Sequence, residues 1–160
     1  MLADDAIERY ARQIVVPGIG AAGQERLLAA TALVVGHERG CRQAALYLEA
    51  AGVRVLREAA CAEGAKPDLV VVADAGVLDE GTRAALLRAA SPLCWYATGP
   101  DGFSSGVHPA SPLPSPASAS GEPDDALHDA AACDAASVAC AILLGLPCRE
   151  GVVRFDVLSS

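Results

Sequence analysis

The chain has 160 residues, 52% of them hydrophobic, and a formal net charge of −8. This length suits one compact domain with a buried core. The acidic balance excludes a typical nucleic-acid interface, which needs clustered Lys and Arg. Acidic residues stand where a signal peptide needs positive charge, and the longest apolar stretch, 130–146, contains an aspartate and a glycine. We therefore expect a cytoplasmic protein with no nucleic-acid and no membrane partner.

The first thirty residues predict two short helices. Asp4 or Asp5 can cap a helix that continues through Ile14 and ends at Pro17-Gly18. A second helix is expected from about residue 21 to 30. Residues 1–30 thus form a helical segment ahead of the first strand.

Strands and helices alternate after this segment. Continuous apolar runs predict strands at 33–36, 53–56, 69–73 and 93–97, with helices at 42–51 and 82–90 and a hairpin-like continuation at 102–107. Gly52 should close the first of these helices, and Leu86 and Leu87 should face inward from the second. This spacing implies right-handed βαβ units and an α/β fold with a Rossmann-like, doubly wound, mostly parallel sheet.

The last third of the chain starts with a segment of different composition. Residues 109–123 are rich in Pro, Ser, Ala and Gly and predict a mobile surface loop. A helix should then run from Asp124 or Asp125 to about Leu144, where Gly145 stops it. The alternating residues 152–158 predict an antiparallel edge strand at the C-terminus. We treat residues 1–160 as a single domain.

Several segments share motifs with one enzyme family. Residues 8–20 read E-R-Y-A-R-Q-I-V-V-P-G-I-G, and residues 23–28 read G-Q-E-R-L-L. This opening resembles that of the ThiF/MoeB/HesA adenylyltransferases, bacterial relatives of ubiquitin-activating enzymes. The D-L-V-V-V-A-D run at 68–74, G-F-S-S-G-V at 102–107 and the closing L-L-G and F-D-V-L-S resemble later landmarks of that family.

The resemblance implies an activity as well as a fold. Members bind ATP and magnesium and adenylate the C-terminal carboxylate of a small ubiquitin-like or sulfur-carrier protein. Residues 1–30 would be a dimerisation segment. The partners that this resemblance implies are a second copy of the chain, or a full-length ThiF-like enzyme in a heterodimer.

The glycine-rich turn of the family reads G-x-G-G-x-G, whereas this chain has G-H-E-R-G-C at 36–41. Bare glycine backbone lets a phosphate approach the amides at the start of a helix. Here Glu38 adds negative charge, which Arg39 can partly neutralise. The sequence therefore predicts a broken phosphate cradle, with Gly36 and Arg39 as its remaining nucleotide-binding candidates.

Three other residues match functional positions of the family. Asp74, at the end of a strand, matches the magnesium-associated aspartate, and the alternative is a turn or helix-capping role. Glu58 is the candidate for holding the ribose hydroxyls, and the alternative is a solvent-facing side chain. Arg12 matches the arginine that reaches into the partner subunit's ATP site. Its alternative is a helix retained only for packing or dimerisation.

Other elements of the family's chemistry are missing from the sequence. The connection at 59–67 is too short for the N-x-x-R-Q motif and the lysine that grip the phosphates. No C-x-x-C pair is present for zinc, no other metal site is expected, and the 109–123 loop has no cysteine nucleophile. His37, His108 and His128 suggest no common partner.

These observations favour a degenerate family member. We expect a non-catalytic or partner subunit of an adenylating system, which binds ATP and magnesium only if the family activity survives. The alternative is a residual ATP-dependent adenylyltransferase that uses Arg12 and Asp74 on the C-terminal carboxylate of a small protein.

Overall fold

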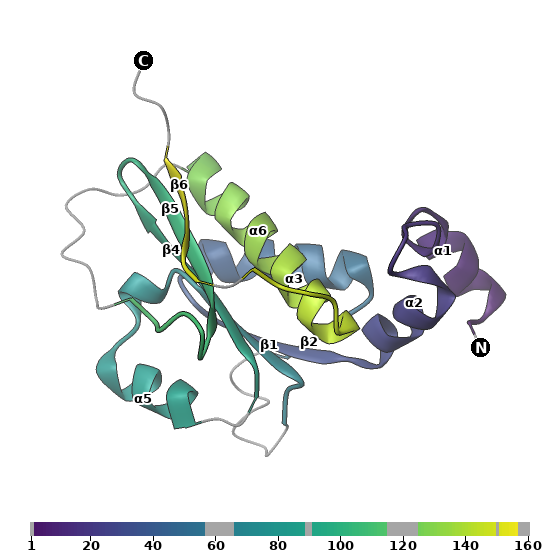
Figure 1. Ribbon diagram of the computed structural model, residues 1–160, viewed down its shortest axis with the longest axis horizontal. Helices are drawn as coiled ribbons and strands as arrows, with labels where there is room; N and C mark the ends of the chain where they lie inside the picture. Colours follow the sequence, from purple (N-terminus) through teal and green to yellow (C-terminus); the bar gives the residue numbers. More distant parts are fainter. Residues whose placement is uncertain (1, 57–65, 89–90, 115–124, 150, 157–160) are drawn as a thin grey trace.

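The computed structural model describes residues 2–56, 66–88, 91–114, 125–149 and 151–156 (Figure 1). The elements in chain order are α1 (Asp4–Ile14), α2 (Gly20–Ala29), β1 (Thr31–Gly36), α3 (Glu38–Ala51), β2 (Arg54–Leu56), β3 (Leu69–Ala73), the 3-10 turn η1 (Ala75–Val77), α5 (Glu80–Arg88), β4 (Leu93–Gly99), β5 (Gly102–His108), α6 (Asp125–Leu144) and β6 (Val153–Asp156). The predicted loop at 109–123 lies mostly outside the described residues, as does the end of the predicted last strand.

The six strands form one sheet in the order β2-β1-β3-β4-β5-β6. Strands β1 to β4 are parallel to one another, and β5 pairs antiparallel with both of its neighbours, β4 and β6. From β1 the chain crosses to β2 in one direction, while β3 and β4 extend the sheet in the other. This confirms the predicted α/β fold with a mostly parallel sheet and an antiparallel C-terminal edge.

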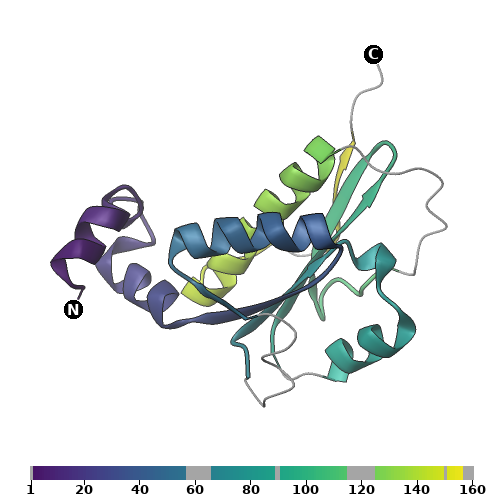
Figure 2. The ribbon, with the colours of Figure 1, turned by 180° about the vertical axis from the view of Figure 1, so that it is seen from behind.

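Both faces of the sheet are covered, which explains why its central strands are continuously apolar. Along β1, Ala32 and Val34 face the core under α2, α3 and α6, whereas Leu33 and Val35 face the core under η1 and α5. Figures 1 and 2 show α3 and α6 packed side by side on one face, with α5 on the other. The sheet is therefore the middle layer of three.

Helix α6 is built from small residues on its buried side. The alanines that lie at 3% exposure or less are Ala131, Ala132, Ala135, Ala136 and Ala139. Their size lets α6 approach α3 and strands β3 to β5 closely. By length and composition this helix, alone among those described, could cross a membrane. In this structure its alanine side packs on the sheet and on α3.

The helix ends follow the sequence signals with two differences. Gly52 caps α3 in the left-handed conformation at φ 96°, as predicted, and the Asp79 carboxylate caps α5 by accepting from the Thr82 amide at 2.9 Å. Leu86 is buried as expected, but Leu87 is 44% exposed, so that prediction was wrong. Helix α5 lies on the surface, and its buried side contains Arg83 and Leu86 but not Leu87. Helix α3 also begins earlier than predicted, at Glu38 rather than residue 42.

Helices α1 and α2 form an arm at one end of the molecule (Figures 1 and 2). Tyr10 is buried at 6% exposure, and the Gln13 side chain donates to the Ala50 carbonyl at the end of α3. Arg26 fixes α2 to the C-terminal end of α6 through a 3.1 Å hydrogen bond to the Leu144 carbonyl. The arm therefore packs against the ends of α3 and α6, far from the point where α6 begins.

Candidate functional site

In an open parallel sheet, ligands bind at the carboxyl edge, where the order of the strands reverses. Here that point lies between β1 and β3. Gly36 ends β1 at φ 121°, and a side chain there would meet the Ala73 carbonyl, because an added Cβ would lie 1.9 Å from its oxygen. The next residue, His37, donates its amide to that same carbonyl at 2.8 Å. Gly36 thus permits the close approach of β1 and β3.

Helix α3 begins immediately after this turn. His37 occupies the N-cap position, and its side chain makes no capping hydrogen bond. Gly36, His37 and Glu38 are exposed to solvent. The Glu38 carboxylate pairs with Arg42 at 3.2 Å, one turn further along the helix. The exposed start of α3 therefore carries a carboxylate side chain where the family has a bare glycine.

Gly40 is buried and has a packing role. A Cβ at this position would lie 1.9 Å from the Tyr96 hydroxyl and 3.1 Å from the Ala73 side chain. The missing side chain lets α3 lie directly on β3 and β4. Gly40 therefore allows close contact between the helix and the strands. Its position does not match a glycine of the family's turn, so the sequence alone did not reveal this role.

Arg39 points to α6. Its guanidinium contacts Asp125 at 2.8 Å and Asp129 at 3.2 Å, both in the first turns of that helix. The two carboxylates neutralise the cation and hold its position. Among the described residues, both basic side chains at the start of α3, Arg39 and Arg42, are thus engaged by carboxylates.

Asp74 follows β3 and has an unusual backbone conformation. It lies at φ 59° and ψ 75° and is, among the described residues, the one non-glycine residue with positive φ. Its side chain is 5% exposed and accepts hydrogen bonds from the Thr98 hydroxyl at 2.8 Å and the Thr98 amide at 3.4 Å. It occupies the N-cap position of η1, where its carbonyl accepts from the Val77 amide at 3.2 Å and its side chain makes no capping bond. A buried carboxylate held in a strained conformation is typical of functional sites.

Two histidines meet at this edge, which the sequence analysis missed. The rings of His37 and His128 stack with centroids 4.8 Å apart and planes 11° apart. His128 is 4% exposed with no partner for its Nδ1 among the described residues, and burial lowers its pKa, an effect that Asp74 partly opposes. His37 precedes α3 and His128 lies in α6, far apart in the sequence, so no local pattern signalled the contact.

Tyr96 lies beneath the same edge. It is fully buried, and its hydroxyl has no hydrogen-bond partner among the described groups. Burial raises the pKa of the Tyr96 hydroxyl, and the nearby Asp74 carboxylate raises it further. We call His37, Arg39, Asp74, Tyr96 and His128 the carboxyl-edge cluster. Its ionisable groups come from α3, β3, β4 and α6.

The predicted site residues fall into two groups. Gly36, Arg39 and Asp74 meet at the carboxyl edge, whereas Arg12 is exposed on the arm. Helix α6, which begins beside Arg39 and ends beside the arm, has 20 residues and spans about 30 Å. One chain therefore does not bring Arg12 to Asp74. Glu58 lies outside the described residues.

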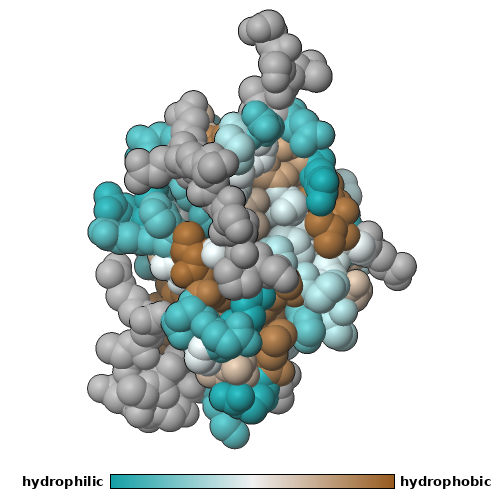
Figure 3. Space-filling model, turned by 90° about the vertical axis from the view of Figure 1, so that its left-hand side faces the viewer, coloured by the Kyte–Doolittle hydropathy of each residue, from teal (hydrophilic) through white to brown (hydrophobic). Residues whose placement is uncertain are grey.

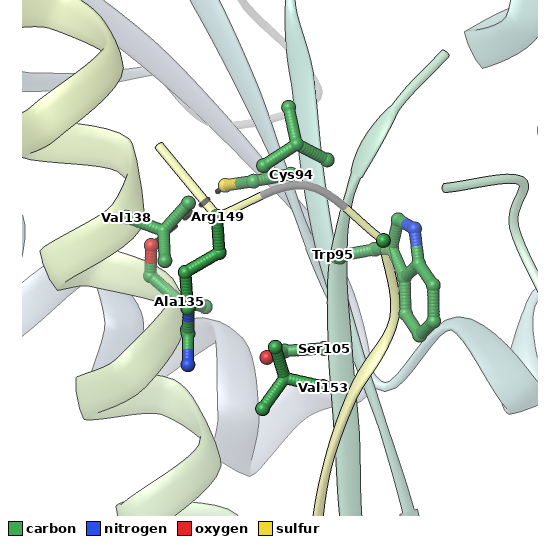
Figure 4. A pocket seen from close by; sticks show the side chains of 10 residues that line it. Cys94, Trp95, Ser105, Ala135, Val138, Arg149 and Val153 are labelled. Carbon is green, nitrogen blue, oxygen red and sulfur yellow. Dashed lines mark hydrogen bonds between the residues drawn. The ribbon is translucent and has the colours of Figure 1, made fainter. Parts of the chain in front are cut away.

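The structure also contains a pocket away from this edge, between α6 and strands β4 to β6 (Figure 4). Cys94, Ala135 and Val138 give it an apolar wall, and Ser105 and Arg149 supply polar groups. Both polar side chains already bind Asp134, at 2.7 Å and 2.6 Å. On the face shown in Figure 3, apolar side chains form separate patches among polar ones. None of the predicted site residues lines the pocket, so we place the candidate site at the carboxyl edge.

The carboxyl edge does not fit the polyphosphate of ATP. Glu38 stands at the start of α3, and Asp74, Asp125 and Asp129 lie near the same edge, whereas Arg39 and Arg42 are already paired. A polyphosphate would meet net negative charge and no free cation among the described side chains of the turn. Across all the residues that the structure describes, no group of three or more His, Cys, Asp or Glu side chains is arranged to hold a metal ion.

Comparisons of sequence point to one family. A stretch of 52 residues is 50% identical to the vegetative HesA protein of Trichormus variabilis (strain ATCC 29413 / PCC 7937), and covers 32% of this chain and 20% of that protein. A stretch of 47 residues is 51% identical to the heterocyst HesA protein of the same organism, and covers 29% of this chain and 18% of that protein. The match thus spans about a fifth of the length of these relatives. No protein-family model matches the chain.

Solved structures share the fold over most of the chain. A crystal structure of PaaA aligns with a TM-score of 0.64 at 12% identity, over 98% of this chain and 75% of that one. E. coli MccB aligns at 0.61 and 10% identity, over 93% and 69%. E. coli MccB with MccA aligns at 0.61 and 9% identity, over 98% and 74%. In sequence motif and in fold, the chain is a relative of the ThiF/MoeB/HesA proteins.

Proposed function

We propose that this chain is a non-catalytic partner subunit of a ThiF/MoeB-type adenylating enzyme. The observation that carries the proposal is the pairing of Arg39 with Asp125 and Asp129 beside Glu38. Because the two carboxylates neutralise Arg39, the turn after β1 lacks the positive charge that stabilises a reacting phosphate. The arm with Arg12 is retained, so the chain keeps a feature that acts on another subunit.

The arm suits pairing with a similar helix. The acidic residues of α1 lie in its first half, at Asp4, Asp5 and Glu8, and its arginines lie at Arg9 and Arg12. Two such helices packed antiparallel would place opposite charges against each other, as a two-fold axis requires. The large apolar side chains exposed on or beside the arm are Ile7, Val15, Val16 and Leu28. A second copy, or the arm of a full-length relative, would cover them.

The adenylated partner in this proposal is the C-terminal carboxylate of a small ubiquitin-like or sulfur-carrier protein. The fold shared with the structure of MccB with MccA supports a system that includes a second, separate polypeptide. The subunit proposed here would supply Arg12 to the nucleotide site of the catalytic chain. The distance between Arg12 and the carboxyl edge of its own chain favours such action in trans.

The test is ATP–pyrophosphate exchange by a full-length ThiF-like enzyme from the same cell, with and without this chain. Arg12→Ala should reduce the stimulated exchange by tenfold or more, because a guanidinium at a reacting phosphate stabilises developing charge. Arg88→Ala on α5 is the control, since Arg88 is an exposed arginine away from the arm. Unchanged exchange with Arg12→Ala in a stable complex would contradict the role of Arg12.

The conformation of Asp74 favours a second candidate, a residual adenylyltransferase. A buried aspartate at positive φ lowers the stability of the fold, and residues of this kind cluster at functional sites. In that case the chain alone should catalyse ATP–pyrophosphate exchange with an acceptor peptide, and Asp74→Asn should abolish it. Exchange by the isolated chain would replace the partner-subunit proposal with this one.

A further inference from the structure

The first turns of α3 and α6 are joined at the carboxyl edge by two kinds of contact. Arg39 of α3 binds Asp125 and Asp129 of α6, and the His37 ring stacks on the His128 ring. Both helices therefore direct their N-terminal ends, which carry partial positive charge, toward this edge. The histidine pair lies between two positive helix ends and beside a guanidinium.

The two histidine rings stack on each other. No side-chain hydrogen bond of His37 caps α3, and His128 Nδ1 has no partner among the described residues. The charged groups that act on His128 are Arg39 of α3, Asp74 after β3 and Asp125 of α6. Tyr96 of β4 lies near Asp74 and Asp129, and Glu38 of α3 pairs with Arg42. Asp125 and Asp129 are committed to Arg39, and Asp74 to Thr98.

We propose that the His37–His128 pair is an acid-sensitive latch, which holds the first turns of α6 on α3 at neutral pH and releases them when His128 is protonated. The neutral rings stack favourably, whereas a charge on His128 would lie against the His37 ring and near the Arg39 guanidinium. A charge on His128 would also be buried, with no acceptor for its Nδ1 proton. Release of the helix end would open the carboxyl edge beside Asp74 and Tyr96.

The direction of the pH effect follows from the surroundings of His128. Burial lowers its pKa, and the neighbouring His37 and Arg39 lower it further, while Asp74 and Asp125 oppose the shift. A histidine with a lowered pKa in the closed form binds protons more readily in the open form. The closed form is therefore favoured above the ordinary histidine pKa of about 6.5, and opening increases as the pH falls below it.

Hydrogen exchange of the α6 backbone tests the latch without nucleotide or partner. Protection of the amides at 128–133, corrected for the intrinsic exchange rate, should fall by up to about tenfold between pH 7.5 and pH 5.5. This limit is the largest change in the opening equilibrium that protonation of one group can cause between these two pH values, when the pKa of that group in the open form is about 6.5. Amides at 138–144, near the other end of α6, should change much less. Equal protection of residues 128–133 at both pH values would overturn the proposal.

Two substitutions separate the latch from general acid sensitivity. His128→Phe keeps a stacked, buried ring but cannot bind a proton, so it should remove the pH dependence of protection at 128–133. His128→Leu, a smaller apolar side chain that also cannot bind a proton, tests the same point should His128→Phe not fold. His108→Phe on β5 is the control and should behave like the unsubstituted chain. A pH dependence that persists in His128→Phe or His128→Leu would contradict the latch, and the partner-subunit proposal would be unaffected.

Discussion

Gly36→Ala is expected to destabilise this protein by about 2–5 kcal/mol. The added Cβ would lie 1.9 Å from the Ala73 carbonyl oxygen, a backbone atom that also accepts from the His37 amide. Overpacking of this kind costs about 1–3 kcal/mol, and the positive φ adds about 1–2 kcal/mol for a residue with a side chain. The sum is a large part of the 5–15 kcal/mol that stabilises a typical domain. Thermal unfolding followed by circular dichroism measures the loss.

Gly20→Ala is the matched control for this substitution. Gly20 also has positive φ, at 61°, but a Cβ there has no atom within 4 Å. Gly20→Ala should therefore lower the free energy of unfolding only by the cost of the positive φ, about 1 kcal/mol. Equal destabilisation by the two substitutions would show that contact with Ala73 is not the reason for Gly36.

Gly40→Ala should destabilise the protein by about 2 kcal/mol, although alanine is the better helix former by about 1 kcal/mol. The new methyl group would overlap the Tyr96 hydroxyl, which is fully buried and cannot swing away into solvent. Chemical denaturation with urea gives the free energy of unfolding for each variant. This result would assign Gly40 to packing rather than to phosphate binding.

Tyr96→Phe makes this prediction specific. The Tyr96 hydroxyl has no hydrogen-bond partner among the described groups, so its removal alone should change stability by less than about 1 kcal/mol. In the Tyr96→Phe background, Gly40→Ala should lose much of its effect, but not all, because the ring carbon that carried the hydroxyl remains 3.1 Å from the new Cβ. Gly81→Ala in α5, where the nearest atom is an Asp79 carboxylate oxygen at 3.1 Å, should be much less destabilising than Gly40→Ala. Additive effects of the two substitutions at 40 and 96 would refute the contact.

Much of the fold was predictable because its signals are local. The strand at Leu69–Ala73 was placed at its observed bounds, since a continuous apolar run between polar residues specifies a strand buried on both faces. Gly52 and Gly145 marked the ends of α3 and α6, where both take positive φ. The error at Leu87 arose because a short surface helix buries only one side, and the sequence alone did not show which residues lie on it.

The site was predictable only where it follows a strand. Gly36 and Asp74 were found because residues after parallel strands meet at one edge. The pairing of Arg39 with Asp125 and Asp129 and the stacking of His37 on His128 depend on how α3 packs against α6. Such contacts join residues that are distant in the sequence, and helix periodicity carries no information about them.

We propose that the chain has the fold of the ThiF/MoeB/HesA relatives without a working nucleotide site. Isothermal titration calorimetry of the purified protein with ATP and magnesium tests it, with static light scattering on the same sample to give the subunit number. We predict no binding up to millimolar ATP by a stable dimer. Binding in the micromolar range would show that the altered turn still holds phosphate, and would contradict the proposed loss of the nucleotide site.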